Sequence, residues 1–215
     1  MAKILSAAEA AQHITDKQTL MIGGFLSAGT PEKLIRALIA QGTKNLHLIC
    51  NDPGQEGLAI YDLVRLKRCR KLSSTYVGRN PFVEEYTSDK SMELELVPQG
   101  TLAERVRAGG AGLGGILTPT GVGTVAAEGK QTLVVDGKPY LLELPFHADV
   151  AFIKAKTADT QGNLLFHGTA RNQNPGMGTA ATVVIAEVEE ILPVGGIDPD
   201  AVHLPGLFVD FLVLN

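Results

Sequence analysis

The stretch TLMIGGFLSAGTPEKLIRALIAQGTKNLHLIC, residues 19–50, decides the fold. An apolar run at residues 19–22 is followed by a glycine-rich loop and then by a helix with its apolar side chains on one stripe, namely Leu34, Ile35, Leu38 and Ile39. Gly42 can cap the end of this helix, and a second apolar run occupies residues 46–50. Continuous apolar strands are typical of a parallel sheet that is covered on both faces. The segment therefore predicts a β-α-β unit.

Helices and strands continue to alternate downstream of this unit. The pattern predicts helices at residues 58–66 and 81–86, and strands at residues 72–77 and 94–97. Such alternation produces parallel strands joined by right-handed crossovers. We therefore expect residues 1–215 to form one α/β domain, with an open, mostly parallel mixed sheet flanked by helices.

Two pairs of residues have the Ser/Thr-x-x-Glu spacing of a capping box, which satisfies amide groups at the start of a helix. Ser6 and Glu9 predict a helix over residues 7–14. Thr101 and Glu104 predict another helix, which ends at the next pair of glycines. We interpret both helices as scaffold.

Residues 109–124, GGAGLGGILTPTGVGT, contain seven glycines in sixteen positions. Compact domains rarely contain so long a loop unless it has a function. A flexible lid and a ligand cradle are both open interpretations, and the interspersed apolar residues favour a loop ordered against a core or another chain. Beyond it, Asp136 and Gly137 separate two apolar runs, which predicts an antiparallel hairpin outside the parallel sheet.

The last third of the chain predicts a short helix after Asp198 and four more strands, at residues 148–153, 164–167, 182–186 and 207–214. A polar turn is expected at residues 157–163, and a second polar, turn-rich segment follows at residues 169–178. Its cluster of Arg171, Asn172 and Asn174 is denser than a plain turn requires. A functional role and capping of the following helix both remain open for these side chains.

Composition narrows the classes of function. The 215 residues are 45% hydrophobic, and 19 Lys and Arg against 23 Asp and Glu give a net charge of −4, so a polyanion such as nucleic acid is not an expected partner. The sequence predicts neither a signal peptide nor a membrane-spanning helix. Two cysteines without a disulfide or metal-binding pattern favour a cytoplasmic protein. Five scattered histidines predict no metal site, and we expect no bound cofactor.

The glycine-rich loop after the first strand is the candidate binding element. Because it connects a buried strand to a helix N-terminus, free amides and the helix dipole favour an anion there. The spacing approaches that of a Walker A loop, but Thr30 and Pro31 replace the required Lys-Ser/Thr, which excludes nucleotide hydrolysis. The alternative is that these glycines only permit a tight turn.

Several longer motifs occur in order along the chain. They are GGF at residues 23–25, PQGTLAERVRAGGAGLGG at 98–115, LTPTGVGT at 117–124, EGK at 128–130 and DGKPYLLELP at 136–145. Together they resemble the alpha subunit of family I coenzyme A transferases, over nearly the whole chain. The resemblance is closest to the acetate/butyrate–acetoacetate branch, and the 3-oxoadipate and succinyl-CoA:3-ketoacid branches remain open. A non-catalytic module that binds a phosphorylated metabolite is a more remote alternative.

This resemblance implies a ping-pong transfer of coenzyme A between an acyl-CoA and a free carboxylic acid, through a glutamate in an S-E-N-G motif of the beta subunit. Glu56 and Glu128 are the only glutamates here that precede glycine, and neither lies in that motif. The resemblance thus implies no catalytic residue on this chain, a beta-subunit partner in an α2β2 assembly, and coenzyme A as substrate. Its proposed coenzyme A contacts here are Gly23, Gly24, Phe25, Leu26, Ser27, Ala28 and Gly29.

If the loop amides contact coenzyme A, Gly24→Val should abolish binding and leave the fold largely intact. If the glycines serve only a turn, the same variant should lose stability while its folded fraction stays active.

Overall fold

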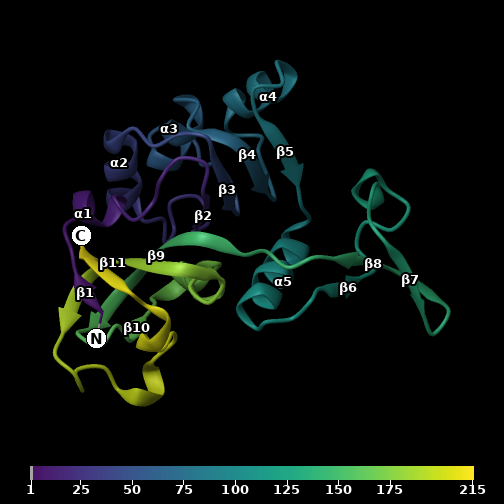
Figure 1. The fold of residues 1–215 in the computed structure, drawn as a ribbon. Coiled ribbons are helices and arrows are strands. Elements are labelled where there is room, and N and C mark those ends of the chain that lie inside the picture. Colours follow the sequence, from purple (N-terminus) through teal and green to yellow (C-terminus); the bar gives the residue numbers. More distant parts are fainter. Residues whose placement is uncertain (1) are drawn as a thin grey trace.

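A computed structural model describes residues 2–215, and a nine-stranded sheet forms its centre (Figure 1). The strand order is β1-β12-β11-β9-β2-β3-β4-β5, and β10 pairs with β9 off this path. The strands are β1 (Lys3–Ile4), β2 (Thr19–Ile22), β3 (Leu46–Cys50), β4 (Cys69–Ser74), β5 (Glu93–Leu96), β9 (Ala148–Asp159), β10 (Leu164–Leu165), β11 (Ala181–Leu192) and β12 (Phe211–Leu214). Every pairing in this sheet except β10 with β9 is parallel, which confirms the expected mostly parallel sheet.

Helices cover both faces of this sheet and create two hydrophobic cores. The helices are α1 (Ala7–Ala11), α2 (Glu32–Gln41), α3 (Ala59–Arg65), α4 (Pro81–Ser88), α5 (Gln99–Gly110) and α6 (Asn174–Met177). Successive side chains of a strand point to opposite faces, so Leu20 and Ile22 pack in the core beneath α1–α4, whereas Met21 packs in the core beneath α5 and α6. Burial on both faces explains why these strands read as continuous apolar runs.

The hairpin forms a small antiparallel sheet that projects away from the rest of the molecule (Figure 1). Its order is β6-β8-β7, with β6 at Ile116–Thr118, β7 at Thr132–Val135 and β8 at Lys138–Glu143. Asp136 and Gly137 have φ values of 49° and 74°, the left-handed conformation that a two-residue hairpin turn requires at both positions. The predicted hairpin is confirmed. Residues 109–124 are not one continuous loop, because β6 lies within them.

The second capping box is wrong. Helix α5 begins at Gln99 after Pro98, so Thr101 lies inside its first turn, and Glu104 bonds to the Arg107 side chain at 2.8 Å. Proline fixes φ and lacks an amide hydrogen, which makes the position before the helix a natural start two residues earlier than the box predicts.

The first capping box is confirmed by reciprocal bonds. The Ser6 amide donates to Glu9 Oε2 at 2.9 Å, and the Glu9 amide donates to Ser6 Oγ at 3.2 Å. The helix that they begin is shorter than predicted, because α1 ends at Ala11 instead of Ile14.

The strands of the last third also differ in length from the prediction. β9 and β11 each run for twelve residues and pair with each other along most of that length. The turn expected from Thr157 onward starts later, because Thr157 and Asp159 are both buried in β9. Partners distant in sequence hold these polar residues in an extended conformation. Conversely, residues 206–208 form a 3₁₀ turn, so the final strand starts at Phe211.

The pH dependence of stability is expected to include a contribution from His47 on β3. Burial, aided by the nearby Lys71 ammonium, lowers the pKa of His47 from 6.5 to about 4. A depressed folded-state pKa means that stability is fully present above pH 6.5 and is lost as the pH falls toward 4, because the unfolded chain binds the proton first. Thermal midpoints measured from pH 7 to pH 4 should therefore fall less steeply for His47→Gln than for the unmodified protein. Parallel curves would contradict this prediction.

Candidate functional site

The predicted binding loop lies at the carboxyl ends of the central strands. Residues 23–29, the glycine loop, follow β2, whose neighbours in the sheet are β3 on one side and β9 on the other. The chain first builds β2 to β5 outward and later returns to add β9 on the opposite side of β2. Ligands of open α/β sheets bind at such a switch in strand order. The fold thus places the glycine loop where a substrate is expected.

The glycine loop is a tight turn anchored to its neighbours. Phe25 and Ala28 exchange amide-to-carbonyl hydrogen bonds of 3.0 Å each, and Leu26 between them has a φ of 51°. The Leu26 amide donates to Asp52 Oδ2 at 3.0 Å, and the Thr30 hydroxyl donates to the Leu26 carbonyl at 2.5 Å. These bonds fix the direction of the loop relative to β3.

Asn174 braces the glycine loop from the other side. It is fully buried, and its Nδ2 donates to the carbonyls of Gly29 at 3.0 Å and Ala170 at 2.8 Å. Its Oδ1 accepts the Lys154 amide of β9 at 2.9 Å. Asn172, which is exposed, donates to the Ala28 carbonyl at 2.9 Å. Two asparagines of the predicted polar cluster therefore hold the loop.

The third member of that cluster behaves differently. Arg171 is exposed and its guanidinium contacts the His203 ring. Nearby positive charge and burial both act on His203, and burial is the larger cause of its lowered pKa. Arg171 makes no contact with the glycine loop among the hydrogen bonds of residues 2–215.

Three loop positions require glycine for internal packing. A Cβ at position 23 would lie 1.9 Å from Asn174 Oδ1, and one at position 29 would lie 2.7 Å from Asn174 Nδ2. At position 24, where φ is +117°, a Cβ would lie 2.4 Å from the Thr30 hydroxyl oxygen. Our expectation that Gly24→Val spares the fold is therefore wrong, because the new side chain would clash within the loop before it could reach a ligand.

The start of α2 is not open to an external anion. Glu187 of β11 is fully buried, and its Oε2 accepts the amides of Lys33 at 2.9 Å and Leu34 at 3.1 Å. The expectation of free helix amides is wrong here, since the protein's own carboxylate occupies them. Amides within the loop remain available: no hydrogen bond within residues 2–215 uses the N–H of Gly24, Ser27 or Gly29.

A cavity of about 190 Å³, the aromatic cavity, opens on the β3 side of the glycine loop. Its exposed walls are the rings of Phe25 and Tyr76, which are 46% and 53% exposed. Large aromatic side chains left in water beside a cavity are typical of a ligand site. The cavity is further lined by Leu26, Asn51, Asp52, Thr75, Arg79 and Gln99.

A hydrogen-bonded network forms the polar floor of the aromatic cavity. Gln99 Nε2 donates to Asn51 Oδ1 at 2.7 Å, and the Thr75 hydroxyl donates to the Asn51 carbonyl at 2.8 Å. Asp52 Oδ1 accepts the Gly54 amide at 3.0 Å, so both of its carboxylate oxygens are engaged. A carboxylate tied to backbone amides in this way is suited to hold the loop and poorly suited to attack a thioester.

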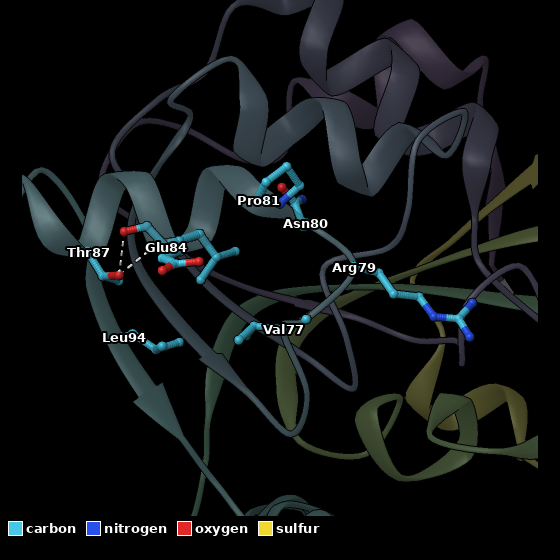
Figure 2. A pocket seen from close by; sticks show the side chains of 9 residues that line it. Val77, Arg79, Asn80, Pro81, Glu84, Thr87 and Leu94 are labelled. Carbon is cyan, nitrogen blue, oxygen red and sulfur yellow. Dashed lines mark hydrogen bonds between the residues drawn. The ribbon is translucent and has the colours of Figure 1, made fainter.

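A second cavity of about 410 Å³ adjoins this region but lacks the glycine loop (Figure 2). The loop after β4, helix α4 and Leu94 of β5 enclose it. Figure 2 shows Arg79 extending away from Val77, Glu84 and Leu94, and Arg79 also lines the aromatic cavity. Its guanidinium donates to Gln55 Oε1 at 2.7 Å. Arg79 thus belongs to the rim of the aromatic cavity.

Other candidate nucleophiles lie outside the site or are inert. Glu56 and Glu128 are exposed and line neither cavity beside the glycine loop. Burial raises the pKa of the Cys69 thiol to about 12 and that of the Cys50 thiol well above its usual range, so neither forms a thiolate near neutral pH. Residues 2–215 contain no group of three or more side chains placed to hold a metal ion.

Sequence reasoning missed the floor of the aromatic cavity. Asn51 and Asp52 directly follow β3, and Thr75 and Tyr76 directly follow β4. Polar residues that come just after buried parallel strands meet at one edge of the sheet, so the signal was present in the sequence. Gln99 was inconspicuous because its contact depends on where α5 begins.

Comparison with known proteins assigns the family. The family model described as "Coenzyme A transferase" matches residues 4–215. The chain is 52% identical over 202 residues to one of the subunits of a succinyl-CoA:3-ketoacid coenzyme A transferase of Xanthomonas campestris, covering 94% of this chain and 84% of the relative. It is 43% identical over 213 residues to the alpha subunit of the acetate CoA-transferase of Escherichia coli K12, covering 99% and 97%.

A solved structure shows the same fold at lower identity. The acyl-CoA transferase of Escherichia coli O157:H7 superimposes with a TM-score of 0.89 at 23% identity, covering all of this chain and 47% of that chain. The chain therefore spans about half the length of that enzyme. No helix of residues 2–215 is long and apolar enough to cross a membrane. From the family match and these relatives, the chain belongs to the coenzyme A transferase family and corresponds to its alpha subunit.

Proposed function

We propose that this chain is the alpha subunit of a two-subunit enzyme that moves coenzyme A between a short-chain acyl-CoA, such as acetoacetyl-CoA or butyryl-CoA, and a free acid such as acetate. One observation carries the proposal: an open cavity beside the glycine loop is lined by no free carboxylate, because both oxygens of Asp52 are bonded to amides. Such a cavity can hold a thioester but needs a nucleophile from outside the chain.

In the proposed reaction, the thioester carbonyl is attacked by a glutamate carboxylate of the beta subunit. Coenzyme A thiolate leaves and a mixed anhydride forms; the thiolate then attacks the glutamyl carbonyl and releases the free acid. The acceptor acid reverses both steps. This chain would supply the glycine loop, whose unpaired amides can stabilise developing negative charge on oxygen.

We further propose an α2β2 assembly in the cytoplasm. The projecting three-stranded sheet and its neighbouring segments expose several apolar side chains, among them Leu117 at 43%, Val125 at 83% and Val134 at 70%. Apolar surface of this kind is commonly covered by another chain. The match of this chain to about half of a single-chain acyl-CoA transferase also supports a second chain that supplies the remainder.

The preferred acid is tested by a substrate panel with the reconstituted alpha–beta complex. Acetoacetyl-CoA serves as donor, and acetate, butyrate, succinate and 3-oxoadipate compete as acceptors. The proposal expects the highest kcat/KM with acetate or butyrate. A clear preference for succinate or 3-oxoadipate would assign the chain to the branch of that acid, and absence of transfer to every acid would overturn the proposed activity.

A further inference from the structure

A cavity of about 340 Å³, the lysine cavity, lies on the β9 side of the glycine loop. Since β3 and β9 flank β2 on opposite sides, the glycine loop separates the lysine cavity from the aromatic cavity. The loop contributes Ser27 and Gly29 to the lysine cavity and Phe25 and Leu26 to the aromatic cavity. One ligand lying across the loop would therefore meet two different environments.

The chemistry of the two cavities differs. The lysine cavity is lined by Ser27, Gly29, Lys154, Lys156, His167 and Glu189. Lys154 and Lys156 are two residues apart on β9, so both side chains leave the same face of the sheet. The aromatic cavity instead has two exposed rings and a hydrogen-bonded polar floor.

Charge accounting leaves positive charge in the lysine cavity. The Lys154 ammonium lies 3.4 Å from Glu187 Oε1, but Glu187 is fully buried and also receives two amides at the start of α2. Lys156 is exposed and has no carboxylate within 4 Å among residues 2–215. Glu189 is the one acidic side chain that lines the cavity itself.

We propose that the lysine cavity binds the phosphate groups of coenzyme A, while the aromatic cavity takes the acyl thioester end. The inference rests on the proposed function and deepens it. The pantetheine and thioester parts of an acyl-CoA are uncharged, and its phosphates are the only strongly anionic groups. Phosphates favour ammonium groups and unpaired amides, and the cavity offers Lys154, Lys156 and the N–H groups of Ser27 and Gly29.

The test uses substrates that lack the phosphates. Acetoacetyl-CoA, its 3′-dephospho form and acetoacetyl-pantetheine are compared as donors with the reconstituted complex carrying Lys156→Ala or Lys156→Glu. We expect KM for acetoacetyl-CoA to rise about ten-fold in the alanine variant, and further in the glutamate variant, with KM for acetoacetyl-pantetheine unchanged. An effect that also disappears with the dephospho substrate would place Lys156 on the 3′-phosphate, whereas an effect that persists would place it on the pyrophosphate.

Lys44→Ala is the matched control, because Lys44 is exposed and precedes β3, at the opposite edge of the sheet. It should change KM for none of the three donors. Equal losses with acetoacetyl-CoA and acetoacetyl-pantetheine, or no loss in either Lys156 variant, would overturn the inference. Failure of the proposed function is distinguishable, since the unmodified complex would then transfer coenzyme A from no donor.

Discussion

Purified alone, this chain is expected to transfer no measurable coenzyme A from acetoacetyl-CoA to acetate, with turnover lower than that of the complex by roughly 10⁴-fold or more. The physical reason is the missing nucleophile. No S-E-N-G motif occurs in the sequence, and Asp52, the carboxylate nearest the glycine loop, is bonded through both oxygens. The measurement is acetate-dependent loss of acetoacetyl-CoA, with and without the beta subunit.

Reconstitution supplies the control for this experiment. Adding the beta subunit should restore turnover and should increase the mass found by light scattering to that of an α2β2 complex. A beta subunit in which the S-E-N-G glutamate is replaced by glutamine should restore the mass but not the activity. Robust turnover by the isolated chain would contradict the assigned mechanism, and a single unchanged alpha chain after mixing would contradict the assembly.

Asn174→Leu is expected to have the largest effect among substitutions in this chain. Leucine has nearly the same size but cannot replace the hydrogen bonds to Gly29, Ala170 and Lys154, all made by a fully buried amide. Buried backbone groups left unpaired cost about 1–3 kcal/mol each, so we expect a loss of roughly 3–5 kcal/mol in the free energy of unfolding. Denaturant unfolding of the chain measures this loss directly.

Asn172→Ala is the matched control for Asn174→Leu. Asn172 also bonds to the glycine loop, through the Ala28 carbonyl, but it is exposed, so water can replace its side chain. We expect a change of less than about 1 kcal/mol in stability. If Asn174→Leu unfolds at the same denaturant concentration as Asn172→Ala, then Asn174 does not brace the loop.

The sequence by itself determined the β-α-β frame and its family. Apolar runs such as Leu46–Cys50 are fixed as buried parallel strands by their composition, because only burial on both faces tolerates five successive apolar or weakly polar residues. Local chemistry likewise settled the Ser6–Glu9 capping box and the Asp136–Gly137 turn. In each case the residues that decide the conformation are neighbours in the chain.

Only the tertiary structure decided what the glycine loop is for in its own packing. Asn174 lies 145 residues from Gly29, and Glu187 lies 154 residues from Lys33. Neither partner can be found by local spacing, so the sequence could not show that Asn174 excludes a side chain at Gly23 or that Glu187 closes the start of α2. The physical reason is that contacts across the sheet depend on strand order, and strand order places β9 and β11 beside β2 only after the whole chain has folded.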